Sequence, residues 1–157
     1  MSKTAGSFSL TVEATDSSCP IGETVGRQNM KEAKTPIFSC EGACIRGEIA
    51  RVAANYVARE KPYRRGCHGE LLTVPHSAMA RWVETADQVV VIDGCFLHCH
   101  GRVMRGLLGT GRLMEIDALS HYKKYTDIFD IDGVPEEERK AVARSVADWV
   151  LDSIGAE

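Results

Sequence analysis

The densest set of metal-ligating side chains in the sequence is DGCFLHCHGR, residues 93–102, which holds two cysteines, two histidines and an aspartate. It directly follows QVVVI, an apolar run with the β-branched composition of a buried strand. Thiolate and imidazole groups bind soft and borderline metals, and a thiolate also acts as a nucleophile or as half of a redox pair. The segment therefore leaves metal binding, nucleophilic catalysis and redox chemistry open.

A second cysteine pair has the same spacing. Cys40 ends the apolar run TPIFS and is followed by Cys44, just as Cys95 is followed by Cys99. Residues four apart lie on one face of a helix, and the positive N-terminal end of a helix favours thiolate over thiol. With Cys67 entering from the loop between them, up to five sulfurs are expected at one edge of the fold. Such a set fits a tetrahedral zinc site, with buried or redox cysteines as the alternative.

Other polar residues beside these cysteines are candidates for the same site. Either His98 or His100, and equally His68, could replace a sulfur as a metal ligand. Asp93 is a candidate to hydrogen-bond the ligand loop, and capping of the helix that begins near Cys95 is the role we expect for it. Cys19 lies before Pro20 in a polar segment and is expected to be a bystander thiol.

The elements that must position these residues alternate between strands and helices. Strands are predicted at TPIFS, QVVVID and RLMEIDAL, with a weaker one over residues 68–74. Helices are predicted for GACIRGEIARVAANYVARE and for FLHCHGRVMRGLL, after Pro75 as far as Ala86, and from Pro135 to Ile154. This order indicates an α/β fold: a three-layer sandwich with a mostly parallel, open, Rossmann-like sheet. In such sheets ligands bind beyond the carboxyl ends of the strands, where Cys40 and Cys95 fall.

We expect a polar N-terminal arm over residues 1–33, with a short strand at SFSLTVEA, and one α/β domain over residues 34–157. The length of 157 residues fits one domain, and a net charge of −3 gives no reason to expect nucleic acid as a partner. No apolar run is long enough for a membrane span, and the N-terminus lacks the apolar region of a secretory signal. A cytoplasmic location is therefore expected, and the protein partner is left unknown. Clustered thiols in such a reducing compartment more often mean metal binding or catalysis than disulfides.

The segments VVVIDGCFLHC and FSCEGACIRGEIA, with the isolated Gly66-Cys67 between them, resemble the DGC-domain family. These are small bacterial and archaeal proteins described as zinc-binding and named for the tripeptide that is Asp93-Gly94-Cys95 here. The resemblance covers roughly residues 35–120. It implies a metal-binding role without an established reaction. The ligands that it implies are Cys40, Cys67, Cys95 and Cys99, and Cys44 is an additional thiol that we keep as a fifth candidate.

Two rival interpretations remain. The stretch CEGACIR fits C-x5-R, the oxyanion loop of thiol phosphatases and arsenate reductases, in which Cys40 would be the nucleophile and Arg46 the anion clamp. Gly47 stands where a Ser or Thr commonly follows that arginine, so Arg46 as a solvated helix residue is favoured. Alternatively, the two thiol pairs could cycle between dithiol and disulfide.

Overall fold

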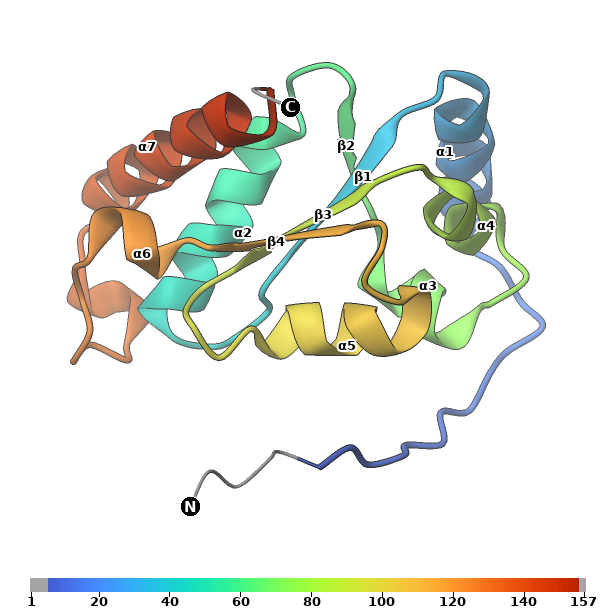
Figure 1. Cartoon of the computed structure of the whole chain (residues 1–157), viewed down its shortest axis with the longest axis horizontal. Coiled ribbons are helices and arrows are strands. Elements are labelled where there is room, and N and C mark those ends of the chain that lie inside the picture. The colour runs from blue at the N-terminus through green and yellow to red at the C-terminus, as the bar shows by residue number, and fades with distance from the viewer. Residues whose placement is uncertain (1–5, 156–157) are drawn as a thin grey trace.

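The computed structural model describes residues 6–155, and its elements form four parallel strands flanked by helices (Figure 1). The strands are β1 (Thr35–Ser39), β2 (Tyr63–Arg65), β3 (Val89–Asp93) and β4 (Leu113–Asp117), in the order β2-β1-β3-β4. Every pair of neighbouring strands in this sheet is parallel. The predicted α/β fold with an open parallel sheet is therefore confirmed.

Helices cover both faces of the sheet and complete the three layers (Figure 1). On one face α2 (Ile45–Val57) packs against α7 (Glu136–Gly155). The opposite side carries α1 (Pro20–Lys31), α3 (His68–Thr73), α4 (Ala78–Thr85) and α5 (Cys99–Leu108). A short helix α6 (Leu119–Tyr122) and a 3-10 turn (Ile131–Gly133) connect β4 to α7.

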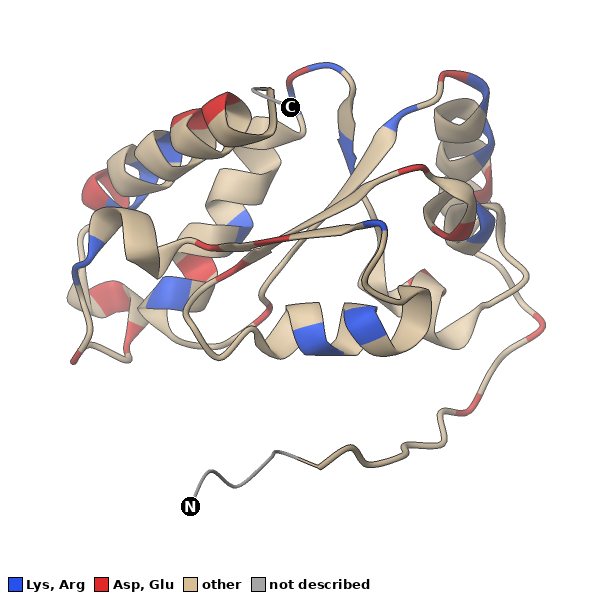
Figure 2. Cartoon of the chain, in the orientation of Figure 1, with Lys and Arg blue, Asp and Glu red and all other residues tan. Residues whose placement is uncertain are grey.

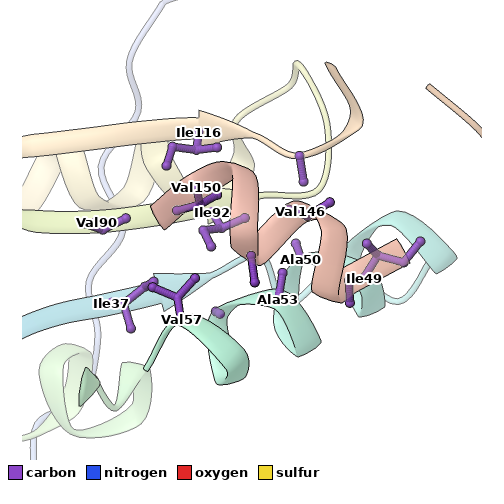
Figure 3. Close-up of a cluster of buried hydrophobic side chains, with 14 of the residues drawn as sticks. Ile37, Ile49, Ala50, Ala53, Val57, Val90, Ile92, Ile116, Val146 and Val150 are labelled. Atoms are coloured by element: carbon purple, nitrogen blue, oxygen red, sulfur yellow. The ribbon is translucent and has the colours of Figure 1, made fainter. Parts of the chain in front are cut away.

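Alternate residues of the central strands supply two hydrophobic cores, one on each face. Ile37, Val90 and Ile92 face α2 and α7, where Ile49, Val57 and Val150 close around them (Figure 3). Phe38, Val89 and Val91 face the opposite side together with Trp82 and Met104. All five residues of β3 are buried, as expected for a central parallel strand with a continuous apolar sequence.

The strand order places a topological switch point between β1 and β3. β1 is followed by a crossover to β2 on one side, whereas β3 and β4 extend the sheet on the other side. The two central strands end side by side, since Ser39 pairs with Ile92 and the amide of Cys40 donates to the Ile92 carbonyl at 2.8 Å. The chain therefore delivers the residues after β1 and β3 to the position where ligands bind in open α/β sheets.

Two predictions about local structure were wrong. Residues 68–73 form the helix α3 instead of a weak strand, and the strand of that region is β2, a three-residue segment rich in arginine. Periodicity cannot reveal so short and charged a strand. No strand is described over SFSLTVEA in the N-terminal region.

The N-terminal segment also contains more structure than the expected arm, because residues 20–31 form α1. Pro20 starts the helix, and the thiol of Cys19 accepts a hydrogen bond from the Gly22 amide at 3.5 Å. A Cβ on Gly26 would lie 2.4 Å from the backbone of Ala78, so α1 meets α4 through a small residue. Because glycine occupies the buried face, the helix lacks the apolar periodicity on which the prediction depended.

Acidic and basic residues both occur on the flanking helices (Figure 2). None of the helices within residues 6–155 has the length and hydropathy needed to cross a membrane.

Candidate metal centre

Five of the cysteines come to the carboxyl edge of the sheet. Cys40 directly follows β1, and Cys67 and Cys95 each lie two residues beyond a strand. Cys44 precedes the first residue of α2, and Cys99 is the first residue of α5. All five are free thiols: Cys67 and Cys99 are exposed, and the other three are partly buried. The sixth, Cys19, caps α1 and belongs to a different part of the fold.

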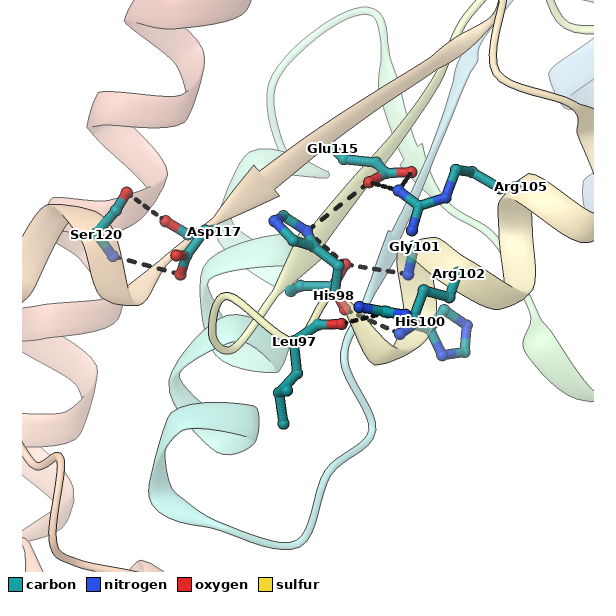
Figure 4. A network of polar contacts seen from close by, with 10 residues as sticks. Leu97, His98, His100, Gly101, Arg102, Arg105, Glu115, Asp117 and Ser120 are labelled. Carbon is teal, nitrogen blue, oxygen red and sulfur yellow. Dashed lines mark hydrogen bonds and ion pairs between the residues drawn. The ribbon is translucent and has the colours of Figure 1, made fainter. Parts of the chain in front are cut away.

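Asp93 anchors the start of α5 from the end of β3. Its side chain is 1% exposed, and its two carboxylate oxygens accept the amides of His100 and Gly101, each at 3.0 Å (Figure 4). The expected capping role is thus present, although the helix begins at Cys99 and not at Cys95. Gly101 has no room for a side chain, because a Cβ there would lie 2.8 Å from Asp93 Oδ2. Asp93 therefore fixes the position of Cys99 and His100.

His98 points toward carboxylates instead of toward the thiols. Its Nδ1 lies 3.4 Å from Asp93 Oδ2 and 3.8 Å from Glu115 Oε2 (Figure 4). Glu115 also accepts a hydrogen bond from Arg105 at 2.8 Å. The backbone of His98 has a positive φ of 48°, so this residue turns the loop into α5. Of the histidines in the DGCFLHCHGR segment, His98 thus belongs to an acidic network.

His68 and His100 form a second, buried group. Their rings meet edge to face with centroids 3.9 Å apart, and the ring of Phe38 contacts His68 at 4.8 Å. Burial and the neighbouring His100 and Arg65 lower the pKa of His68 to about 3, and burial also lowers the pKa of His100. Within residues 6–155, both ring nitrogens of His68 and the Nε2 of His100 are buried without a hydrogen-bond partner, as is the Nδ1 of His98.

The loop after β1 lies against this histidine pair. Glu41 Oε1 is 3.4 Å from His68 Nε2 and accepts a hydrogen bond from Ser39 at 3.2 Å. Arg65, at the end of β2, donates to Ser39 at 3.0 Å and has a lowered pKa because it is buried. The ends of β1 and β2 and the start of α3 are therefore joined by polar contacts.

Cys40 is partly buried in this loop. Burial raises the pKa of its thiol, and the charges of Asp93 and Cys99 act in the same direction. The amides of Gly42 and Gly94 oppose the shift, and the Gly42 amide donates to the sulfur at 3.2 Å. A thiol with a raised pKa is a weak nucleophile at neutral pH, but it can bind a metal ion that displaces its proton.

Cys44 has the opposite electrostatic environment. Burial acts to raise the pKa of its thiol, but the amides of Gly47 and Arg46 and the Arg46 guanidinium outweigh burial and lower it. Arg46, the anion clamp for Cys40 in the rival oxyanion-loop interpretation, thus interacts with Cys44. Tyr122 of α6 lies on the same side, and its buried hydroxyl has no hydrogen-bond partner among the described residues. Burial raises the pKa of Tyr122, with further contributions from Cys44 and from Cys95.

The thiols consequently divide into two groups along the edge. Cys44 and Cys95 lie near Tyr122. Cys99, in contrast, is close enough to Cys40 to raise the pKa of its thiol. Cys67 and Cys99 each directly precede a histidine of the contacting pair in the sequence. Within residues 6–155, no three His, Cys, Asp or Glu side chains are arranged around a common point that could hold a metal ion. Metal binding therefore requires side-chain rotation, and the exposed thiols have room for it.

The backbone of the edge is packed through glycine. A Cβ on Gly94 would lie 2.8 Å from the carbonyl carbon of Arg46, and one on Gly47 would lie 2.2 Å from the Gly42 oxygen. The loop after β3 therefore touches the first turn of α2 directly. The glycine of the Asp-Gly-Cys tripeptide is required by this close approach.

Comparison with protein families shows to which family the chain belongs. The family model described as the DGC domain matches residues 36–144, which include all five cysteines of the edge. The chain belongs to the DGC-domain family. Comparisons with curated proteins and with solved structures found no match. The DGC domain thus comprises the whole sheet except Thr35, whereas α1 and the last turns of α7 lie outside the match.

Proposed function

We propose that this DGC-domain protein binds zinc at the carboxyl edge of its sheet, in a structural, regulatory or metal-handling role. The observation that supports the proposal is the convergence of thiols at the ends of three different strands, around the switch point. Cys40, Cys67, Cys95 and Cys99 are the ligands that we propose first, with Cys44 as a fifth candidate. Thiolates bind Zn²⁺ at about 2.3 Å in tetrahedral sites, and free thiols are the chemistry that such a site needs.

The residues fit a zinc ion in two further respects. Buried ring nitrogens without partners lie beside the thiols, and they are donors of the kind that zinc accepts. All six thiols are free, which suits a protein of a reducing compartment, and we propose the cytoplasm. When bound, zinc would draw the loops after β1, β2 and β3 together, while Asp93 holds Cys99 in place through the amides of α5.

The test is elemental analysis and thiol titration of freshly purified, tag-free protein, before and after denaturation. We expect about one zinc per chain and several thiols that react only after unfolding. Cys99→Ser should lower the zinc content, and Cys19→Ser is the matched control because its thiol caps α1 away from the edge. Metal-free protein with all thiols reactive, or equal zinc in both variants, would contradict the proposal.

A thiol-dependent enzyme is the second candidate, and the observation that favours it is the position of Arg46 beside Cys44. A thiolate next to a guanidinium can attack an electrophile or act on an oxyanion. The predicted nucleophile Cys40 is less suited, since burial raises its pKa. Hydrolysis of an aryl phosphate without metal, lost in Cys40→Ser or in Cys44→Ser, would support this function and identify the nucleophile.

A further inference from the structure

The sequence Cys-His-Gly occurs twice in the chain, and the structure brings its two copies together. Cys67-His68-Gly69 leads into α3, and Cys99-His100-Gly101 begins α5. The two copies lie 32 residues apart in the sequence, yet their imidazole rings are in contact at a centroid distance of 3.9 Å and at 87° to one another. Two histidines, each next to a cysteine in the sequence, therefore meet at the edge.

The histidine rings carry more buried polar atoms than the protein satisfies. His68 Nδ1, His68 Nε2 and His100 Nε2 have no hydrogen-bond partner in the part of the chain that the structure describes. A buried polar atom left unpaired destabilises the folded state, so the rings are poorly explained as packing residues. Phe38 holds the His68 ring from the core side. The rings are thus held in place with nitrogens that make no hydrogen bond, although His68 Nε2 lies 3.4 Å from Glu41 Oε1.

The charge of the neighbourhood also favours imidazole ligands. Four thiolates around Zn²⁺ give a centre of charge −2, whereas two thiolates and two neutral imidazoles give a neutral centre. The buried carboxylate of Asp93 lies behind the first turn of α5. Glu41 Oε1 is 3.4 Å from His68, and Arg65 lies 3.7 Å from the same oxygen and offsets its charge. Adding two negative charges near Asp93 would be costly in a partly buried site, and the neutral centre avoids that cost.

We infer that Cys67, His68, Cys99 and His100 bind one zinc ion in a shell of two sulfurs and two nitrogens. This inference rests on the proposed zinc-binding function and deepens it, because His68 and His100 take the positions that the four-cysteine site gives to Cys40 and Cys95. The two thiols are exposed and must turn toward the rings, whereas the rings already meet.

X-ray absorption at the zinc edge tests the inference on the intact, zinc-loaded protein. The expected spectrum shows sulfur at about 2.3 Å and nitrogen at about 2.0–2.1 Å in equal number, with the outer scattering of imidazole. A shell of four sulfurs would overturn the inference while leaving the proposed function intact. Absence of bound zinc would overturn the proposed function and this inference with it.

Three variants sharpen the test. His68→Gln and His100→Gln should each reduce the imidazole scattering and weaken zinc binding by at least about 10–100-fold, the loss that even an outer hydrogen-bond partner causes. His98→Gln is the matched control and should keep the spectrum, since His98 faces Asp93 and Glu115. An unchanged spectrum and affinity in both ligand variants would refute the assignment.

Cys95→Ser separates the two ligand sets directly. The Cys-His centre predicts one zinc per chain and an unchanged spectrum in this variant. Loss of zinc from Cys95→Ser would overturn the inference and return the site to four cysteines.

Discussion

Removing the carboxylate of Asp93 should loosen α5 and with it the proposed zinc site. The two oxygens of Asp93 accept two amides of the first turn of α5, each at 3.0 Å, from a position that is 1% exposed. A hydrogen bond to a charged group contributes about 1.5–3 kcal/mol, so Asp93→Ala should lower the free energy of unfolding by about 3 kcal/mol. For a chain of this length that corresponds to a fall in Tm of about 6–12 °C.

Denaturant unfolding of the metal-free protein measures this loss, and hydrogen exchange of the α5 amides locates it. Asp93→Asn keeps the shape but turns a donor toward one of the two amides, so it should also destabilise, by about 2–3 kcal/mol. Asp117→Ala is the matched control. Asp117 pairs with Asp93 in the neighbouring strand, but among the described residues its carboxylate accepts a single hydrogen bond, from the exposed Ser120 amide at 3.3 Å, so the cost should be about 0.5–1 kcal/mol.

The reasoning would be refuted if Asp93→Asn left the stability unchanged, because then shape and not charge would hold the helix. It would also be refuted if Asp93→Ala cost no more than Asp117→Ala. Zinc affinity of the same variants gives a second readout. It should fall for Asp93→Ala, since Cys99 and His100 belong to the turn that Asp93 anchors.

Further predictions concern the glycines and the thiols of the edge. Gly94→Ala should destabilise the protein by about 1–3 kcal/mol in denaturant unfolding, because the added Cβ would meet the backbone of Arg46. Gly106→Ala, on the open face of α5, should instead stabilise the protein by about 0.5–1 kcal/mol. Equal effects of the two substitutions would contradict the packing argument. In metal-free protein at neutral pH, Cys44 should react with iodoacetamide faster than Cys40, because its lowered pKa gives it the larger fraction of thiolate. As the pH is raised, the alkylation rate of Cys44 should begin to increase at a lower pH than that of Cys40. Peptide mass spectrometry should show that this advantage shrinks in Arg46→Gln, and equal rates for the two thiols would refute the prediction.

Hydrophobic pattern was sufficient to predict most of the fold. The apolar runs became β1 and β3, and the predicted helix after Cys44 became α2. β2 and α1 were missed for a common reason: neither has large apolar residues at a regular spacing. β2 is Tyr-Arg-Arg, and α1 turns Gly22 and Gly26 toward the core. Close backbone approach depends on tertiary contacts, and a pattern of apolar residues does not report it.

The order of the strands explains how much of the candidate site was predictable. Cys40 and Cys95 could be placed at one edge because each follows a recognisable strand. The thiol that Arg46 approaches could not be predicted, because the first turn of α2, rather than the spacing from Cys40, brings Arg46 to Cys44. The contact of His68 with His100 was equally hidden. It depends on residues 68–73 being helical, whereas a weak strand was predicted there.

The carboxyl edge of the sheet has a tightly packed half and a half with exposed thiols, and this contrast bears on the role of the proposed metal ion. The loops after β1 and β3 are locked by the contact of Gly94 with the first turn of α2, which fixes Cys40 and Cys95 in partly buried positions. Cys67 and Cys99 are exposed, at the starts of α3 and α5. The backbone of Cys99 is held by Asp93 through the first turn of α5, so the openness of this half lies in the exposed thiols. Were zinc to bind on this open half, as proposed above, solvent and other proteins would have access to the ion, as a metal-handling role requires.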